Sequence, residues 1–423
     1  MKKYILLLIL LLIPVNVFGV ELIKTDSKSV IVYDMTDDKI LYDRNGEEER
    51  QVASLTKMMT ALLAIEKVEG DRTKYDFQQQ VTITKEMVSG YQWDASIAGL
   101  KVGDIVTIED LLYGTILPSG ADAAQALAIT LSGSKANFVK EMNDKAKKIG
   151  MTHTKFVNVH GLDKYEKTKP YSTAKDLMTL LQYAMKNETF KNVYTHKYWN
   201  MKNGLEVYTT LNVYRDKFGY DVSGIVGSKT GMTDLAGTCI SAYFISNGHF
   251  YLYVSLGATF SNTAGNHVLD LLHVKDFLNK NYNELTLSEK DKEIKTIKVY
   301  YSKTKLISKR TKKEIKKYLP IDYDKKDFKI TYDGIKEIKA TNLPDKSKPI
   351  GTITYKYKDE VLGTDEIYLT QDIKFDLKEF IKEDEQIVLH AGIAVGAFVL
   401  LLIILMVLIK VIFGKKKKKK NKK

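Results

Sequence analysis

Residues 53–65 read ASLTKMMTALLAI, and this stretch decides the fold around it. The run is apolar on nearly every face of a helix, which is the pattern of a helix buried in a protein core. Ser54 and Lys57 lie three residues apart, so their side chains project from the same face of the first turn and can touch. Serine is also a common helix N-cap, which is the alternative role for Ser54.

Lys57 stands at an unfavourable position for a lysine. A capping box has Glu or Gln three residues after the cap, and the positive end of the helix dipole disfavours a cation in the first turn. Burial and the dipole both lower the pKa of an amine, which favours a neutral lysine that can accept the proton of the serine. The pair is therefore a candidate nucleophile and base.

The formal charge of +13 is concentrated at the two ends of the chain. Residues 415–423 are all lysine apart from Asn421, and three more of the lysines are Lys2, Lys3 and Lys410. The intervening chain is close to neutral. The basicity is therefore a tail and not a binding face, and we expect no nucleic-acid partner.

Two apolar segments indicate export and membrane anchoring. Residues 1–19 combine two lysines, an apolar run and a small residue at a plausible cleavage point, which predicts a secretory signal peptide. Residues 387–413 are almost wholly apolar and long enough to cross a hydrocarbon core of roughly 30 Å. The lysine tail, 414–423, predicts a cytoplasmic C-terminus by the positive-inside rule and also suits anionic lipid. We expect a single-pass protein of the cytoplasmic membrane with an extracellular catalytic domain.

The segment between them divides into two regions. Residues 20–285 mix strands with helices, and Asn247-Gly248 between two apolar runs predicts a hairpin. The only cysteine, Cys239, leaves no internal disulfide and reads as a buried strand residue. Residues 286–373 alternate in the manner of a small all-β domain, and residues 374–386 read as a polar linker. Helices are expected over 108–115, 121–131, 134–149, 172–186 and 264–281.

Three short motifs follow one another in the first region. They are Ser54-x-x-Lys57, then Ser119 in Pro-Ser-Gly-Ala, then Lys229-Thr230-Gly231. Each is weak alone. In this order, with the second before a helix and the third on a strand before a hairpin, they match the serine–lysine acyl-transfer arrangement of penicillin-binding proteins and class A β-lactamases.

The sequence resembles the low-molecular-mass D-alanyl-D-alanine carboxypeptidases, penicillin-binding proteins of the peptidase S11 type. The match includes residues 53–61, 117–124, 156–163 and 227–237, and it covers roughly residues 20–373. The resemblance implies an α+β fold: a penicillin-binding, serine β-lactamase-like domain with an antiparallel sheet and a helical cluster, then a small all-β domain and a C-terminal transmembrane helix.

The resemblance also implies roles for the motif residues. Ser54 would attack a peptidoglycan stem peptide ending in D-Ala-D-Ala, and β-lactams would be covalent inhibitors. Lys57 would be its base, and Ser119 would relay a proton to the leaving amine. The substrate would meet Lys229, Thr230 and Gly231, and the oxyanion hole would be the N–H groups of Ser54 and Met232. No cofactor is implied, and the sequence shows no metal-ligand cluster.

Two positions depart from the family pattern. Ala121 stands where the second motif usually has asparagine, and Ala258 stands where an arginine usually helps to hold the substrate carboxylate. Arg215 is a candidate replacement, with an exposed loop charge as the alternative. His160 either orders the deacylating water or bonds its own loop backbone. Asp122 and Asp234 read as helix and turn residues.

Two alternatives to a carboxypeptidase remain open from the sequence. A β-lactamase shares the three motifs, but Glu166 is followed by Lys-Thr-Lys and not by the Glu-x-x-Leu-Asn stretch that positions water in that class. A weakly active or inactive peptidoglycan-binding homologue is the second alternative, and Ala121 and Ala258 are its support.

Overall fold

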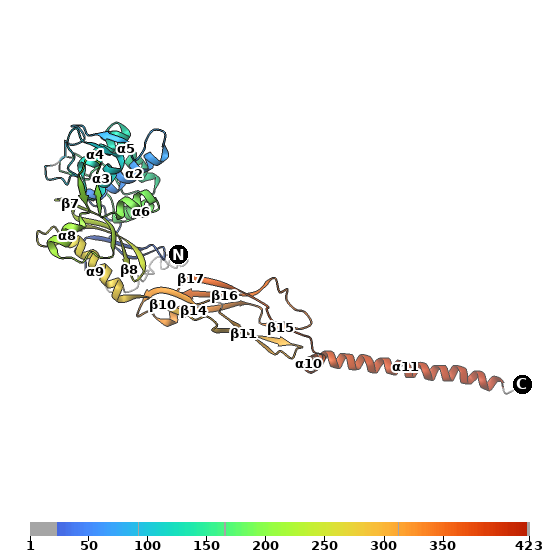
Figure 1. Ribbon diagram of the computed structural model, residues 1–423. Coiled ribbons are helices and arrows are strands. Elements are labelled where there is room, and N and C mark those ends of the chain that lie inside the picture. The colour runs from blue at the N-terminus through green and yellow to red at the C-terminus, as the bar shows by residue number, and fades with distance from the viewer. Residues whose placement is uncertain (1–22, 92, 165, 312, 421–423) are drawn as a thin grey trace, which may run out of the picture. The chain divides into compact units, whose positions relative to one another are not determined.

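The computed structural model describes residues 23–91, 93–164, 166–311 and 313–420. The chain divides into two compact units, residues 1–281 and 282–423 (Figure 1). The predicted signal peptide, 1–19, lies outside the described residues.

A five-stranded antiparallel sheet of order β2-β1-β9-β8-β7 organises the first unit. Asn247 and Gly248 both have positive φ, at 48° and 78°, and they join β8 to β9 as the predicted hairpin turn. Cys239 lies buried and free within β8, as expected. The strands are β1 (Ser29–Asp34), β2 (Lys39–Arg44), β7 (Ile225–Thr233), β8 (Gly237–Ser246) and β9 (His249–Ala258).

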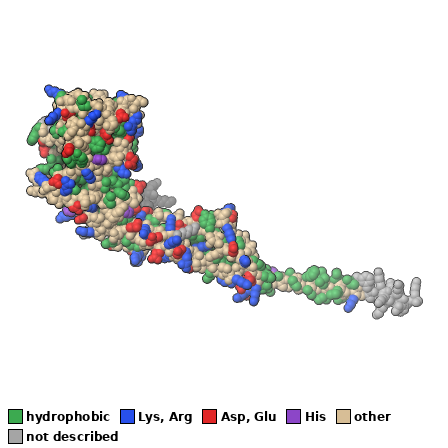
Figure 2. Space-filling view, in the orientation of Figure 1, with side chains coloured by type: hydrophobic (Ala, Val, Ile, Leu, Met, Phe, Trp, Pro, Cys, Tyr) green, Lys and Arg blue, Asp and Glu red, His purple; other side chains and the backbone are tan. Residues whose placement is uncertain are grey.

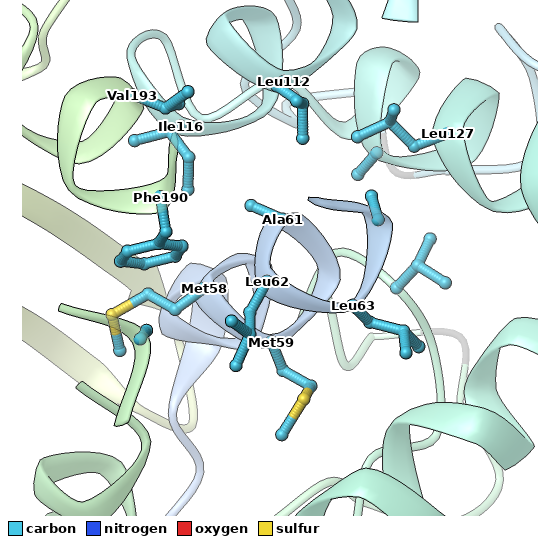
Figure 3. Close-up of a cluster of buried hydrophobic side chains, with 14 of the residues drawn as sticks. Met58, Met59, Ala61, Leu62, Leu63, Leu112, Ile116, Leu127, Phe190 and Val193 are labelled. Carbon is cyan, nitrogen blue, oxygen red and sulfur yellow. The ribbon is translucent and has the colours of Figure 1, made fainter. Parts of the chain in front are cut away.

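Helix α2 (Thr56–Gly70) is the centre of the helical cluster and follows the short 3-10 turn η2 (Ala53–Leu55). Every residue from Thr56 to Ile65 is buried, so the prediction from its apolar pattern is confirmed. Figure 3 shows Met58, Ala61 and Leu62 of this helix beneath side chains of neighbouring helices. The helices that contact α2 are α3 (Ile108–Ile116), α4 (Ala121–Ser132), α5 (Lys135–Lys148), α6 (Ala174–Ala184) and α7 (Glu188–Thr195), and the labelled neighbours in Figure 3 come from α3, α4 and α7.

The two faces of the sheet carry different helices. Side chains alternate along a strand, and Leu252, Val254 and Leu256 of β9 belong to the same core cluster as α2. The opposite face is covered by α9 (Asn266–Asn281), which contacts β8 and β9 (Figure 1). The sheet is thus enclosed on both sides, and the end of β7 is brought against η2.

Several short elements were not predicted from the sequence. They have too few residues for a clear period, and their stability comes from packing. They include α7, α8 (Leu211–Phe218), and the hairpins β3 (Gln80–Thr82) with β4 (Ile105–Thr107) and β5 (Tyr198–Asn200) with β6 (Glu206–Tyr208).

The second unit is β-rich, and it begins earlier than the expected boundary at 285/286. Tyr282 opens strand β10, which pairs with β13 and therefore belongs to this unit. The strands are β10 (Tyr282–Ser288), β11 (Glu293–Tyr300), β12 (Leu306–Arg310), β13 (Ile315–Pro320), β14 (Phe328–Gly334), β15 (Glu337–Lys339), β16 (Pro349–Tyr357) and β17 (Glu360–Tyr368).

The segment expected as a polar linker, 374–386, is not wholly irregular. It contains helix α10 (Leu377–Glu383), whose Phe380 packs on Tyr301 of the same unit, with ring centroids 4.9 Å apart. Helix α11 (Glu385–Lys420) follows directly. Its part from Glu385 to Val411 is long and apolar enough to cross a membrane, and Figure 2 shows hydrophobic side chains along it.

Candidate active site

The structure brings Ser54 and Lys57 together at the start of α2. Ser54 lies in η2 and Lys57 in the first turn of the helix, and Lys57 Nζ is 2.8 Å from Ser54 Oγ. Lys57 Nζ also donates to the carbonyl of His160 over 2.8 Å. Only 1% of Lys57 is exposed to solvent. The serine therefore has one buried amine as its immediate partner.

Burial sets the protonation of this amine. It lowers the pKa of Lys57 from 10.5 to about 7, and the negative charge of Asp122 opposes this shift. A large share of Lys57 is then neutral near pH 7, and a neutral amine can accept the proton of Ser54 over the same 2.8 Å contact. The geometry and the pKa both suit a general base.

The loop 156–163 packs against Ala53, the residue before Ser54. Asn158 Oδ1 accepts hydrogen bonds from the backbone N–H of His160 (3.2 Å) and of Gly161 (2.7 Å). Gly161 has φ +81°, and a Cβ at this position would lie 1.8 Å from the carbonyl oxygen of Ala53. Ala53 itself has a left-handed φ of 46°. Ala53, the residue before Ser54, thus has an uncommon backbone conformation, and Gly161 packs directly against its carbonyl oxygen.

His160 contributes its backbone and not its ring to the Lys57 contact. The buried ring accepts a hydrogen bond at Nδ1 from the N–H of Leu162, at 3.2 Å, so it bonds its own loop backbone. Burial, with the charges of Lys57 and Lys135, lowers the pKa of His160 to about 3, so the ring is neutral. Sequence reasoning missed the carbonyl, because a main-chain oxygen has no signal in the sequence.

Ser119 lies in the loop before α4 with an unusual backbone. Its φ is 64°, its side chain is buried, and its hydroxyl has no hydrogen-bond partner within the described part of the chain. A buried hydroxyl without a partner is costly and is a common feature of functional sites. The Ser119 hydroxyl can therefore form a hydrogen bond with a substrate or take part in proton transfer.

Asp122 positions the neighbouring loop, a role that goes beyond the expected helix residue. Its buried carboxylate accepts hydrogen bonds from the N–H groups of Ala98 (2.8 Å), Gly99 (3.0 Å) and Leu100 (3.0 Å). Ala121 beside it is fully buried and donates its N–H to the carbonyl of Ser96 at 2.9 Å. The position that is usually asparagine is thus packed beneath this loop.

The third motif lies on β7, next to η2. Lys229 is fully buried, and its Nζ donates to the carbonyl of Thr230 at 2.7 Å. Burial and then the charge of Lys57 lower the pKa of Lys229 well below its ordinary value. Thr230 Oγ1 lies 2.8 Å from Thr210 Oγ1, just before α8.

Gly231 allows the close approach of β7 to the backbone of Ser54. A Cβ at Gly231 would lie 3.0 Å from the backbone nitrogen of Ser54 and 3.1 Å from the Cβ of Ala53. The next residue, Met232, has a side chain that is 56% exposed. The backbone nitrogen atoms proposed for the oxyanion hole therefore belong to two segments in contact.

Arg215 and Ala258 lie on different elements. Arg215 is on α8 and not in a loop, and its exposed guanidinium donates from Nε to Asp216 Oδ1 at 2.7 Å. This matches the alternative of an exposed charge. Ala258 is buried at the end of β9.

Met232 is one of the residues that line a cleft of about 760 Å³. Its walls are the β7–β8 turn, residues 162–164 with Lys169, the end of β9 and residues 49–51. Asp234 lies exposed on this turn, as expected. Asp163 Oδ2 accepts a hydrogen bond from Thr233 Oγ1 at 2.8 Å and joins two of the walls. The charged side chains along the cleft are Lys28, Glu49, Arg50, Asp94, Asp163, Lys164, Lys169 and Asp234.

Among the described residues, no group of three or more His, Cys, Asp or Glu side chains is arranged to hold a metal ion. The groups available at the site are the two buried amines of Lys57 and Lys229, the hydroxyls of Ser54, Ser119 and Thr230, and backbone N–H groups.

Comparison with known proteins identifies the family of the chain. The family model for D-alanyl-D-alanine carboxypeptidase, peptidase S11, matches residues 16–259. The chain is 29% identical to the D-alanyl-D-alanine carboxypeptidase DacF of Bacillus subtilis over 354 residues, which is 82% of this chain and 86% of that protein. It is 36% identical over 181 residues to DacC of Escherichia coli, which is 42% of this chain and 44% of that one.

Solved structures show the same fold. Penicillin-binding protein 5 from Haemophilus influenzae aligns with a TM-score of 0.56 and 24% identity over 83% of this chain and 98% of that one. Penicillin-binding protein D2 from Listeria monocytogenes, in an ampicillin-bound form, aligns with a TM-score of 0.51 and 26% identity over 60% of this chain and 97% of that one. These neighbours have the α+β fold that the sequence predicted.

Proposed function

Because this chain belongs to the D-alanyl-D-alanine carboxypeptidase family of serine peptidases, we propose that it is a membrane-anchored enzyme that removes the terminal D-alanine from peptidoglycan stem peptides through an acyl-enzyme on Ser54. The observation that carries the proposal is the 2.8 Å contact between Ser54 Oγ and the buried amine of Lys57.

In the proposed first step, Ser54 Oγ bonds to the carbonyl carbon of the penultimate D-alanine and its proton passes to neutral Lys57. Ser119 then relays a proton to the leaving nitrogen, and the peptide bond breaks to free D-alanine. Water then hydrolyses the resulting ester: its oxygen bonds to the acyl carbon, the bond to Ser54 Oγ breaks, and a proton from the water restores the Ser54 hydroxyl. This divides one difficult step into two easier ones. The Ser119 hydroxyl has no hydrogen-bond partner among the described residues, which supports its part in the relay.

Charge on the reacting oxygen would be stabilised by the N–H groups of Ser54 and Met232. The close approach of Gly231 to Ser54 supports this pairing. Each such donor is typically worth about 3 kcal/mol of barrier.

The terminal carboxylate would be held by Lys229 and Thr230. An arriving carboxylate raises the pKa of Lys229 and favours its charged form, which opposes the effect of burial. The remainder of the stem peptide would continue past Met232 into the cleft, whose walls carry both signs of charge.

The apolar helix from Glu385 to Val411 supports a single membrane span. We propose that the lysines after it lie in the cytoplasm and that residues 20–386 lie outside the cell.

The test uses the full chain in membranes, with a fluorescent penicillin and, separately, a pentapeptide ending in D-Ala-D-Ala. Wild type should be labelled and should release D-alanine, and Ser54→Ala should do neither. Ser347→Ala, at an exposed serine of the second unit, is the matched control and should behave as wild type.

Each alternative has its own result. A label on wild type without D-alanine release would indicate an inactive homologue, and rapid loss of the label would indicate a β-lactamase. Persistent labelling of Ser54→Ala would overturn the mechanism.

A further inference from the structure

Thr210 lies between the segments that carry the second and third motifs. Its backbone N–H donates to the carbonyl of Leu117 at 3.1 Å, two residues before Ser119. Its hydroxyl oxygen accepts a hydrogen bond from Thr230 Oγ1 at 2.8 Å. Thr210 is therefore held against both segments, through its backbone on one side and through its side chain on the other.

The Thr210 hydroxyl has no part in starting helix α8. A threonine at a helix N-cap usually has an extended backbone, and its side chain accepts a hydrogen bond from an N–H of the first turn. Thr210 immediately precedes α8, but its φ and ψ are −60° and −18°, and its side chain makes no capping hydrogen bond. Local structure therefore does not explain this hydroxyl.

The pair of threonine hydroxyls has one proton left for a ligand. Thr230 donates its proton to Thr210, and the proton of Thr210 has no acceptor within the described part of the chain. Thr210 is partly exposed, whereas Thr230 is buried, so a ligand reaches Thr210 more easily. A hydroxyl that accepts a hydrogen bond also becomes a stronger donor.

The surroundings of the pair favour an anion as this ligand. Lys229 Nζ donates to the carbonyl of Thr230 at 2.7 Å, so a buried amine contacts the same residue. Hydrogen bonds from a hydroxyl to an ionised carboxylate are short and strong. Ala258, where an arginine was expected, is buried and has no side-chain donor.

We propose that Thr210 binds the terminal carboxylate of the substrate by donating its hydroxyl proton, beside Lys229 and Thr230. This rests on the carboxypeptidase function proposed above. Lys229 supplies the charge that attracts the carboxylate, and the threonine pair supplies a directional hydrogen bond. Thr210 thereby favours substrates that end in a free carboxylate.

The experiment measures KM and kcat of the full chain in membranes on two substrates that share one acyl group. The first is the pentapeptide ending in D-Ala-D-Ala. The second is the corresponding ethyl thioester, in which a neutral thiol replaces the terminal D-alanine and no carboxylate is present. Thr210→Val removes the hydroxyl at nearly constant volume, and Thr210→Ser restores it. Thr189→Val, at a partly buried threonine whose hydroxyl donates to Glu69, is the matched control.

Thr210→Val should raise the KM for the pentapeptide roughly 3- to 10-fold, as expected for the loss of one hydrogen bond, and should leave kcat nearly unchanged. The KM for the thioester should stay as in wild type. Thr210→Ser and Thr189→Val should behave as wild type on both substrates. An unchanged pentapeptide KM in Thr210→Val, or an equal rise on both substrates, would overturn the role of Thr210.

Urea unfolding establishes that each variant is folded, and Thr210→Ala replaces Thr210→Val if the valine is not accommodated. Absence of D-alanine release by wild type would overturn the proposed function itself. The concentration dependence of penicillin labelling then decides the role of Thr210, because penicillin also carries a carboxylate. Weaker binding of penicillin by Thr210→Val would support that role, and unchanged binding would overturn it.

Discussion

Two buried lysines serve the candidate site from different elements, and their surroundings differ. Lys57 on α2 lies 2.8 Å from the hydroxyl of Ser54 and 2.8 Å from the carbonyl of His160. Lys229 on β7 donates to the carbonyl of Thr230. Burial lowers the pKa of both. Asp122 partly opposes this effect at Lys57, whereas the charge of Lys57 adds to it at Lys229.

The difference suggests two kinds of work for the same residue type. Lys57 has a titration midpoint near neutrality and a hydroxyl in reach, which suits proton transfer. Lys229 is disfavoured as a cation until an anion arrives, which suits binding of a carboxylate. The two departures from the family pattern, Ala121 and Ala258, are at positions expected to contact substrate. Ser54 and Lys57 both match the pattern.

The largest effect is expected for Lys57→Met, which removes the base and keeps the volume. The rate of Ser54 acylation by penicillin should fall roughly 10²- to 10⁴-fold, measured by rapid-mixing labelling. Lys67→Met, on the same helix with its amine paired to Glu141, is the control and should change the rate little. A loss below tenfold in Lys57→Met would contradict the base assignment.

Gly161→Ala should disrupt the packing of the loop 156–163 against Ala53, the residue before Ser54. Its Cβ would meet the carbonyl of Ala53 at 1.8 Å, so we expect a loss of about 2–4 kcal/mol in the free energy of unfolding, measured with urea. Gly150→Ala is a matched control, because its φ of 91° is similar but a Cβ there meets nothing within 4 Å. Equal losses would show that backbone strain, and not the clash, accounts for the effect.

Lys229→Met should weaken substrate binding more than it lowers the rate at which Ser54 reacts. The KM for the pentapeptide should rise roughly 10- to 150-fold, the range for losing a charged hydrogen bond of 1.5–3 kcal/mol. Reaction with a sulfonyl fluoride, which has no carboxylate, should stay within about threefold of wild type, whereas Lys57→Met should slow it strongly. Similar losses with both reagents would remove the distinction between the two lysines.

The smallest effect is a shift in the pH dependence of acylation. The rate should rise with pH and level off above about pH 7, as Lys57 loses its proton. Asp122 raises the pKa of Lys57, so Asp122→Asn should move this midpoint to lower pH. Asp110→Asn weakens the capping box of α3 and controls for lost stability, with no shift expected. A midpoint that rises in Asp122→Asn would contradict the electrostatic argument.

The sequence by itself determined the buried helix α2, the Asn247-Gly248 hairpin and the order of the three motifs. It also determined that the side chains of Ser54 and Lys57 lie close enough to touch. These depend on spacing along one element or on the preferences of adjacent residues, which are local properties. The family followed from the same motifs, and the comparisons confirmed it.

Only the tertiary structure decided the environment of Lys57. Its burial and its contact with the carbonyl of His160 join residues 103 positions apart in the chain. The loop-holding role of Asp122 and the packing of α10 on Tyr301 have the same origin. Solvent exclusion and main-chain acceptors arise when distant segments pack together, and the residue types alone do not specify which carbonyl meets which amine.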